Sequence, residues 1–408
     1  MGYDRDIVIA GAALNGSALA LALAGAGFRV AMVDPVPPAT QEAEGFDGRG
    51  YALALTSQRL LEAIGIWPEV AEHAQPILQI KVSDGRAGEG PSPFVLEFHH
   101  GEIEEGPMGY MAEDRFLRRA MFTAIEASDS IELISGDSVT AHEAGPAGVQ
   151  VELASGRVLS GALLVGCDGR RSATAQRSGI RRMGWDYGQT ALVCAVTHEK
   201  PHHGIAHQFF MPPGPLAILP LPGNISSIVW TESHEEAVRI QALGDADYLE
   251  ALRPRFGDFL GEIGLAGARF TYPLNLTLAN AYVAERVALV GDAAHGVHPI
   301  AGQGLNAGLK DVAALVEVLA LARRRGEDIG RLDVLERYQQ WRRFDVATLA
   351  VATDAINRLF SNDNSLLRLG RDLGLGLVNA LPDLRRAFIR EAAGLTGELP
   401  KLLQGRPV

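Results

Sequence analysis

Cysteine is nearly absent from this chain of 408 residues. Only Cys167 and Cys194 occur. Two thiols cannot form a disulfide framework or a four-ligand zinc site. Both lie in apolar, strand-like segments, which predicts buried and unreactive thiols.

Positive charge is also scarce, because 37 lysines and arginines face 49 acidic residues and give a net charge of −12. That balance argues against a nucleic-acid partner, which requires a basic surface. No apolar run reaches the roughly 18 residues of a membrane span. The first residues, MGYDRDIVIAG, lack the features of a secretory signal. We therefore expect a cytoplasmic protein that is soluble or bound peripherally at the inner face of a membrane.

What the chain does contain is ordinary globular composition, with 47% hydrophobic and 21% charged residues. Its length predicts about two or three domains. Residues 6–34 show the pattern strand, turn, helix, strand, with the strands at 7–10 and 29–33 and the helix at 17–26. This is the pattern of a dinucleotide-binding βαβ unit.

The turn of this unit spans residues 11–16 and departs from the usual GxGxxG pattern, because Ala13 stands at its middle glycine. It still follows a strand, begins a helix and is followed about 20 residues later by an acid, Asp34. We expect a diphosphate at the helix N-terminus and ribose hydroxyls at Asp34. The alternative is an ordinary α/β crossover with a tight turn.

A second informative stretch is 286–311. Residues 287–290 predict a buried strand, Gly291-Asp292 ends it, and a helix follows from about Leu305. The loop between them contains Pro299, Gly302 and Gly304. Asp292 would repel phosphate, so it suits a hydroxyl-rich part of a cofactor, such as a ribityl chain.

The motifs GDAAH and HPIAGQGLNAGLKD in this stretch resemble the second flavin-binding motif of the FAD-dependent aromatic-ring monooxygenases. The segments GWDYGQTALVCAV, PHHGIAHQFF and GPLAILPLPGN resemble the ubiquinone-biosynthesis hydroxylases (2-polyprenylphenol hydroxylases). The resemblance covers essentially the whole chain. It implies FAD, O₂, and NAD(P)H or another electron donor, although no second dinucleotide fingerprint is present. In this family a hydroperoxide on the flavin transfers a hydroxyl group to a phenol.

The resemblance also implies roles for single residues. Arg49 matches an arginine that contacts the cofactor's phosphates, and Asp114 falls where relatives often present an amide or arginine. Asp168 lies in a DG motif that joins flavin and pyridine-nucleotide functions, with Arg170 and Arg171 after it. The expected catalytic residues are Pro299, Gln303 and Gly304. The expected cofactor-binding residues are Gly11, Ala13, Leu14, Asn15, Gly16, Asp34, Arg49, Asp114, Asp168, Gly291, Asp292, Gly302, Gln303, Gly304, Leu305 and Asn306.

The predicted fold class is α/β. A Rossmann-like FAD-binding domain of the para-hydroxybenzoate-hydroxylase type would comprise residues 1–76, 99–182 and 281–340. An antiparallel-sheet substrate domain would comprise 77–98 and 183–280, and a C-terminal helical region would comprise 341–408. We also expect helices directly after Arg49 and over 110–125.

Several alternatives stay open. A metal site at His202, His203 and His207 is disfavoured, because no carboxylate or cysteine accompanies them at ligand spacing. His295 and His298 would fix their turn by hydrogen bonds or handle protons. The leucine- and arginine-rich C-terminal region would pack on the core, or contact a membrane or the partners of a quinone-synthesis complex. A homo-oligomer is compatible with the sequence.

The function implied is hydroxylation of a polyprenylphenol on the route to ubiquinone. The rivals are another FAD-dependent oxidoreductase, a hydroxylase of a small soluble aromatic, and a non-catalytic scaffold.

Overall fold

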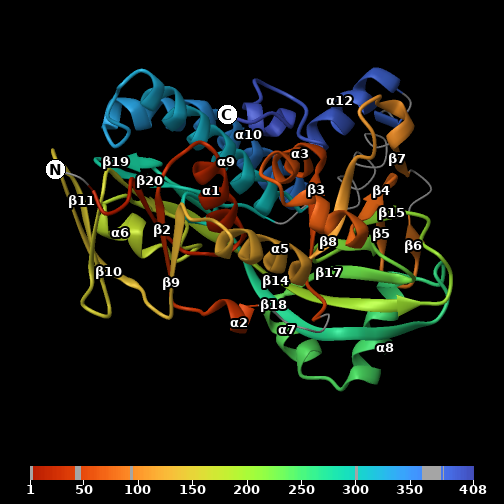
Figure 1. Cartoon of the computed structure of the whole chain (residues 1–408). Helices are drawn as coiled ribbons and strands as arrows, with labels where there is room; N and C mark the ends of the chain where they lie inside the picture. Colours follow the sequence, from red (N-terminus) through yellow and green to blue (C-terminus); the bar gives the residue numbers. More distant parts are fainter. Residues whose placement is uncertain (1–2, 42–46, 92–94, 299–301, 361–377, 380) are drawn as a thin grey trace.

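A computed structural model of the chain describes residues 3–41, 47–91, 95–298, 302–360, 378–379 and 381–408. Two large sheets lie side by side (Figure 1). The six-stranded sheet carries α9 and α10 on one side, and the nine-stranded sheet carries α7 and α8 beneath it (Figure 1). The predicted α/β class with antiparallel sheets is confirmed.

The six-stranded sheet has the order β19-β20-β13-β1-β2-β9 and is parallel except for the edge strand β19. Its strands are β1 (Ile7–Ala10), β2 (Val30–Asp34), β9 (Ile131–Ser135), β13 (Leu163–Gly166), β19 (Val283–Ala284) and β20 (Val287–Leu289). The helices packed around it are α1 (Leu14–Gly25), α5 (Asp114–Glu126), α6 (Ala173–Arg177), α9 (Gln303–Arg324) and α10 (Leu332–Phe360). Because parallel strands are covered on both faces, their residues are almost entirely buried and apolar.

The nine-stranded sheet has the order β21-β18-β14-β17-β16-β15-β5-β6, with β7 also paired to β5. Its strands are β5 (Gln79–Arg86), β6 (Gly90–Pro91), β7 (Leu96–His99), β14 (Arg182–His198), β15 (Ile205–Phe210), β16 (Leu216–Leu221), β17 (Ile225–Ser233), β18 (Ile263–Ala279) and β21 (His295–Gly296). The segment 77–98 therefore joins the sheet formed mainly by residues 183–280. The division into domains stays a prediction, and its boundary at 341 falls inside α10.

Two helices of this region, α7 (His234–Gln241) and α8 (Asp245–Phe256), were not predicted from the sequence. They cover one face of the nine-stranded sheet through a core that includes Leu192, Ile218 and Trp230. The predicted antiparallel sheet gave no reason to expect two helices on one of its faces, because short amphipathic helices between strands show a weak periodic signal.

The helices predicted after Arg49 and over 110–125 are wrong in their first turns. Each segment starts as a strand, β3 (Gly50–Ala54) and β8 (Gly109–Glu113), and only then becomes helical, in α3 (Leu55–Ala63) and α5. These two strands pair with each other and with β4 (Gln75–Ile77). Tertiary pairing between distant segments overrides the local helix propensity of Ala and Leu.

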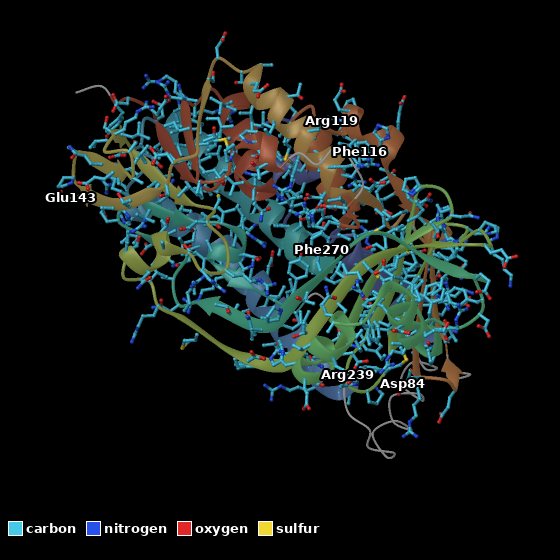
Figure 2. All side chains as sticks on the ribbon, turned by 90° about the horizontal axis from the view of Figure 1, so that it is seen from below. Asp84, Phe116, Arg119, Glu143, Arg239 and Phe270 are labelled. Carbon is cyan, nitrogen blue, oxygen red and sulfur yellow. The ribbon has the colours of Figure 1, made fainter. Side chains whose placement is uncertain are left out.

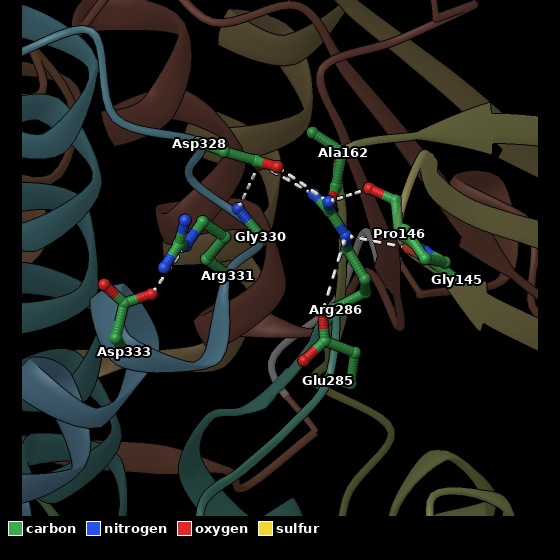
Figure 3. Close-up of polar contacts among 9 residues, drawn as sticks. All are labelled: Gly145, Pro146, Ala162, Glu285, Arg286, Asp328, Gly330, Arg331 and Asp333. Atoms are coloured by element: carbon green, nitrogen blue, oxygen red, sulfur yellow. Dashed lines mark hydrogen bonds and ion pairs between the residues drawn. The ribbon is translucent and has the colours of Figure 1, made fainter.

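Arg286 joins three distant parts of the chain (Figure 3). It lies between β19 and β20, is only 2% exposed, and has a positive φ of 59°. Its guanidinium donates to the carbonyl oxygens of Gly145, Pro146 and Ala162 and forms two 2.7 Å contacts with the Asp328 carboxylate. This arginine therefore fixes the start of β20 relative to the small sheet of β10 (Val139–Gly145), β11 (Gly148–Leu153) and β12 (Val158–Gly161).

The C-terminal helix α12 (Pro382–Ala392) buries Ile389 but leaves Leu381, Leu384 and Phe388 between 39% and 48% exposed. Two of its arginines are held by acids, because Arg385 pairs with Glu102 and Arg390 with Glu105. The helix thus attaches to the protein largely through ion pairs and one buried residue, and it presents apolar side chains to solvent. Among the described helices, none is long and apolar enough to cross a membrane.

The remaining short elements are α2 (Pro38–Gln41), α4 (Trp67–Val70), and the 3₁₀ helices η1 (Ala71–His73), η2 (His100–Glu102), η3 (Gly291–Ala293) and η5 (Lys401–Gln404).

Candidate active site

The first predicted turn is held tightly against its own strands. The backbone N–H of Gly11 donates to Val33 O, and that of Ala12 donates to the Asp34 carboxylate at 2.6 Å. A Cβ atom at Gly16 would lie 2.0 Å from Gly11 O, so only glycine fits there. Within the described residues, the N-terminus of α1 has no side-chain cap and no acid in its first turn. Its free N–H groups suit a diphosphate.

The three predicted turns meet at one place. The Asn15 side chain lies against Gly291 and Gly308, where a Cβ atom would come within 2.4 and 2.2 Å of its amide nitrogen. Arg170, from the DG motif, places Nε 3.1 Å from Oδ2 of Asp292. The turns after β1, β13 and β20 therefore lie close enough together to bind parts of one extended ligand.

Arg49 and Asp114 form an ion-pair cluster beside these turns. Asp114 is 1% exposed, and its Oδ2 atom lies 3.1 Å from Arg49 Nη2 and 2.7 Å from Arg118 Nε. Arg49 also pairs with Asp47 at 2.7 Å and lies over the ring of Phe270, which is labelled near the centre of Figure 2. Arg49 thus contacts β18 of the nine-stranded sheet, and in the sequence it directly precedes β3 of the small sheet.

Two buried acceptor atoms at this site have no hydrogen-bond partner among the described residues, namely Asn15 Oδ1 and Asp114 Oδ1. A buried acceptor without a partner is costly, so a ligand hydroxyl or N–H group is the natural partner for each. A second free helix N-terminus adds to the site. α9 begins after Gly302, whose φ of 65° favours glycine, and within the described residues it has no side-chain cap and no acid in its first turn.

Other predicted residues serve the protein itself. The Asn306 side chain donates to Ala52 O and accepts from Ala54 N and the Ser57 hydroxyl, so it attaches β3 and α3 to α9. The Asp168 carboxylate accepts from Ser172 and from the backbone of Thr174, at the start of α6. Both residues position the turns. Pro299 lies outside the described residues.

Asp311 was not predicted, yet it organises the turn after β20. It is fully buried and accepts from Gly291 N at 2.9 Å, while its ion-pair partners are His295 Nε2 at 2.6 Å and Arg342 Nε at 2.7 Å. Burial alone would raise the pKa of Asp311, but the two basic partners outweigh it and lower that pKa. The sequence separation of Asp311 and Gly291 does not indicate that they interact, because the contact forms only when α9 packs onto the sheet.

The two histidines of this turn differ. His295 makes the expected turn-fixing contact, through Asp311. His298 is 1% exposed, and neither ring nitrogen has a partner among the described residues. Burial, with a smaller effect of Arg170, lowers the pKa of His298 to about 4. Its ring packs edge-on against Tyr187, 5.2 Å between centroids.

A cavity of about 1380 Å³ begins at these turns. At one end it is lined by polar and flavin-motif residues, including Arg49, Arg170, Asp292, Gly302 and Gly304. It then runs across the face of the nine-stranded sheet that α7 and α8 leave uncovered. Strands β14, β16 and β17 contribute the small side chains Ala191, Val193, Ala217 and Val229 there, together with the larger Leu219. The alternate residues of the same strands, among them Leu192, Ile218 and Trp230, are buried under α7 and α8.

The remaining candidates raised by the sequence are histidines and the two cysteines. His202 accepts from the backbone N–H of Gly204 at Nδ1 and donates from Nε2 to the carbonyl oxygen of Leu221 on β16. Among the described residues no group of acids, histidines or cysteines could hold a metal ion. Cys167 and Cys194 are buried and unpaired, as predicted, and burial raises the pKa of both thiols.

Comparison with known families identifies the cofactor. A family model described as "FAD binding domain" matches residues 4–353. The chain belongs to this FAD-binding family. Asn15, Asp114 and the two free helix N-termini fit the hydroxyls, phosphates and ring edge of such a cofactor.

Curated relatives match over nearly their whole length. Ubiquinone hydroxylase UbiL of Rhodospirillum rubrum is 44% identical over 99% of this chain and 93% of that protein. The 3-demethoxyubiquinol 3-hydroxylase of Escherichia coli is 34% identical over 96% and 98%. Human ubiquinone biosynthesis monooxygenase COQ6 is 29% identical over 95% and 92%. The predicted family and the class of FAD-dependent aromatic-ring monooxygenase are thereby confirmed.

Solved structures share the fold. The p-nitrophenol 4-monooxygenase PnpA of Pseudomonas putida superposes with a TM-score of 0.79 at 18% identity, covering 98% of this chain and all of that one. PqsL of Pseudomonas aeruginosa, in complex with 2-aminobenzoylacetate, gives a TM-score of 0.74 at 24% identity, covering 91% of this chain and 99% of that one. The predicted fold type is confirmed.

Proposed function

We propose that this enzyme hydroxylates the aromatic ring of a polyprenylphenol intermediate in ubiquinone biosynthesis. The observation that carries the proposal is one cavity that joins the flavin motifs to a long apolar surface. The names of the 44% and 34% identical relatives, which act in ubiquinone synthesis, support the substrate class.

When bound, FAD supplies the two-electron chemistry and the reaction with O₂ that no side chain can provide. The residues of this chain bind and orient it. In our proposal the α1 N-terminus and Arg49 hold the diphosphate, while Asp34 accepts from the adenosine ribose. Asp292 and Asp114 accept from ribityl hydroxyls. Arg170 is then released from Asp292 or shared with it, since a hydroxyl donor competes for the same carboxylate oxygen.

The first turn of α9 would lie along the pyrimidine edge of the ring. Its N–H groups, at Gln303 and Gly304, and the helix dipole favour negative charge there. Asp311, on α9, fixes the neighbouring turn after β20 by accepting from Gly291 N and by its contact with His295. The apolar floor of small residues keeps water from the reacting ring carbon. A reduced nicotinamide or another reductant supplies the electrons.

The test combines a reaction and a deletion. FAD-loaded enzyme, reductant and O₂ are incubated with candidate polyprenylphenols, and mass spectrometry detects a product heavier by one oxygen atom. A strain lacking the enzyme should accumulate the unhydroxylated precursor, which names the ring carbon. Oxygen insertion only into small soluble aromatics would reassign the substrate. Protein that purifies colourless and cannot be reconstituted with FAD would support a scaffold instead.

We also propose that α12 brings the enzyme to a lipid surface, where such a substrate dissolves. Leu384 and Phe388 are exposed beside Arg386, as in helices that lie in a membrane interface. Flotation with phosphatidylcholine vesicles should recover the wild type and lose most of Phe388→Asp. Equal recovery of both would remove this part of the proposal.

A further inference from the structure

The long strand β14 is paired on both sides along only part of its length. Its second half, residues 189–197, lies between β17 and β18, whereas its first half, residues 182–186, pairs with β18 alone. In the part of the chain that the structure describes, no strand pairs with the other side of residues 182–186. We call this side the open edge. Such an edge presents backbone N–H and C=O groups that another strand can bind.

The hydrogen bonds of β18 show which residues of β14 face the open edge. Ala279 lies opposite Arg182 in the ladder between the two strands. The N–H of Ala279 donates to Ala294 O, on the far side of β18, so this pair is not hydrogen-bonded to each other. Because such pairs alternate along an antiparallel ladder, the backbone groups of Arg182, Gly184 and Asp186 point away from β18, toward the open edge.

The open edge lacks the side chains that usually prevent strand pairing. Proline and lysine commonly protect such edges, and neither occurs in its sequence, RMGWD. Two of its side chains are large, apolar and accessible, because Met183 is 69% exposed and Trp185 is 46% exposed. The register with β18 shifts directly after Asp186, which ends the edge there. This short stretch therefore has the properties of a strand that pairs with another chain.

We propose that a second copy of this chain pairs with the open edge, antiparallel and with its two-fold axis at Gly184. In this register Arg182 of each copy lies opposite Asp186 of the other, and Met183 lies opposite Trp185. Since residues two apart share a face of a strand, one face of the joined strands carries both opposite-charge pairs and the other face both apolar pairs. Gly184 meets itself on the axis, where it brings no side chain between the copies.

The charged side chains of the edge have atoms available for each other. Nη1 of Arg182 has no hydrogen-bond partner among the described residues. Asp186 is held by Gly188 N at 2.7 Å and by His234 Nε2 at 2.9 Å, and both contacts use Oδ1, so Oδ2 can accept from an arginine. One register satisfies both charges in both copies at once. This self-complementarity is the property of an isologous interface and favours a copy of the same chain as the partner.

The expected dimer is weak and independent of the active site. A short edge buries less surface than the roughly 1,000 Å² of a stable interface, so we expect association at micromolar concentrations. None of the residues 182–186 lines the cavity. The inference therefore holds whichever phenol the enzyme hydroxylates.

The first test reverses the charges one at a time. FAD-loaded, full-length enzyme is analysed by sedimentation velocity from nanomolar to high micromolar concentrations, and the wild type should shift from monomer to dimer. Arg182→Asp and Asp186→Arg should each raise the Kd of the dimer by at least about tenfold, because like charges then lie opposite each other. An equal mixture of the two variants should dimerise as the wild type does, because each charge again meets its opposite.

Two further proteins are the controls. The double variant Arg182→Asp/Asp186→Arg restores both pairs within one chain and should dimerise like the wild type. Val158→Asp changes a residue that is 52% exposed on β12, in another sheet, and should leave the Kd unchanged. FAD content and Tm show that each variant is folded. A wild type that stays monomeric at the highest concentration would refute the proposal, as would single variants that dimerise as the wild type does.

A cross-link tests the register itself. Met183→Cys mixed with Trp185→Cys should form a disulfide between copies on mild oxidation, because opposite residues in a pair without hydrogen bonds lie at disulfide distance. The two native cysteines are buried and do not interfere. If Trp185→Cys alone cross-links more readily than the mixture, the axis lies at Trp185 and the proposed register is wrong.

Discussion

The two large sheets of this enzyme differ in how closely residues are packed at their ligand sites. On the FAD side, glycines allow backbone and side chains to approach so closely that an added Cβ at Gly16 or Gly308 would clash. On the other side, the face of the nine-stranded sheet that α7 and α8 leave uncovered borders a wide cavity, and several of its side chains there, such as Ala191, Ala217 and Val229, are small. The residues around FAD are packed closely enough to fit one cofactor, whereas the open face of the nine-stranded sheet leaves room for a bulky ligand.

The difference predicts where substitutions are tolerated. Tight packing around FAD gives no space to relax, so changes there should abolish binding or folding. Atoms that border an existing cavity lose little when trimmed, because they already lack neighbours on one side.

The largest expected effect is on FAD retention. Gly16→Glu should weaken FAD binding by more than about a hundredfold, because a side chain has no space and a carboxylate would face the diphosphate. Gly25→Glu, at the other end of the same helix, meets nothing within 4 Å and is the control. The ratio of flavin to protein absorbance after purification measures both. A yellow Gly16→Glu protein at normal stoichiometry would show that the turn does not hold the diphosphate.

The next effect tests the acid beneath the turn. Asp311→Asn should destabilise the protein by about 3–5 kcal/mol, since it removes the buried partner of Arg342 and leaves only the half-exposed Asp345 to balance that buried charge. Asp333→Asn is the control, because Asp333 pairs with Arg331 at an exposed site where both side chains are more than half accessible. Chemical denaturation measures both. If Asp311→Asn and Asp333→Asn have similar free energies of unfolding, Asp311 contributes less to the stability of the FAD side than its contacts indicate.

Neighbouring residues of β17 compare the two faces of the large sheet directly. Ile228→Ala should cost about 2–4 kcal/mol, because Ile228 is fully buried under the helices. Val229→Ala should cost less than about 1 kcal/mol, because its side chain borders the cavity. Urea unfolding of each variant measures the free energies. Equal losses would contradict the division of the sheet into a packed face and an open face.

The smallest expected effect is a pH dependence at the junction of the two regions. The folded-state pKa of His298, about 4, lies below its ordinary value of 6.5, so the unfolded state binds more protons between these values. Its contribution to stability is therefore complete above pH 6.5 and falls as the pH is lowered toward 4, by about 2–3 kcal/mol. Arg170 and Asp354 are the charged groups that act on it.

His298→Gln should reduce the slope of unfolding free energy against pH in this range. His207, whose pKa burial also lowers to about 4, remains in both proteins and supplies the background slope. An unchanged slope would show that His298 is protonated as easily in the folded protein as in the unfolded chain.

The sequence by itself determined much of the FAD side. Its motifs are short: the strand at Ile7–Ala10, the turn that follows it, Asp34, and the Gly291-Asp292 turn. The structure of each stretch depends mainly on the few residues within it. Hydrophobic periodicity and turn chemistry act over a few residues, so such motifs are readable without a structure. The same locality explains why an antiparallel sheet could be predicted for residues 77–98 and 183–280.

Only the tertiary structure decided how those turns are held and what lies opposite them. Asp311, Arg286 and Arg342 act on residues far away in sequence, and no local pattern marks them. The first strands of the segments after Arg49 and around Tyr110 exist because they pair with each other. The cavity likewise depends on which face of each strand the helices α7 and α8 cover. Alternation along a strand gives two faces, but packing alone determines which of them stays open.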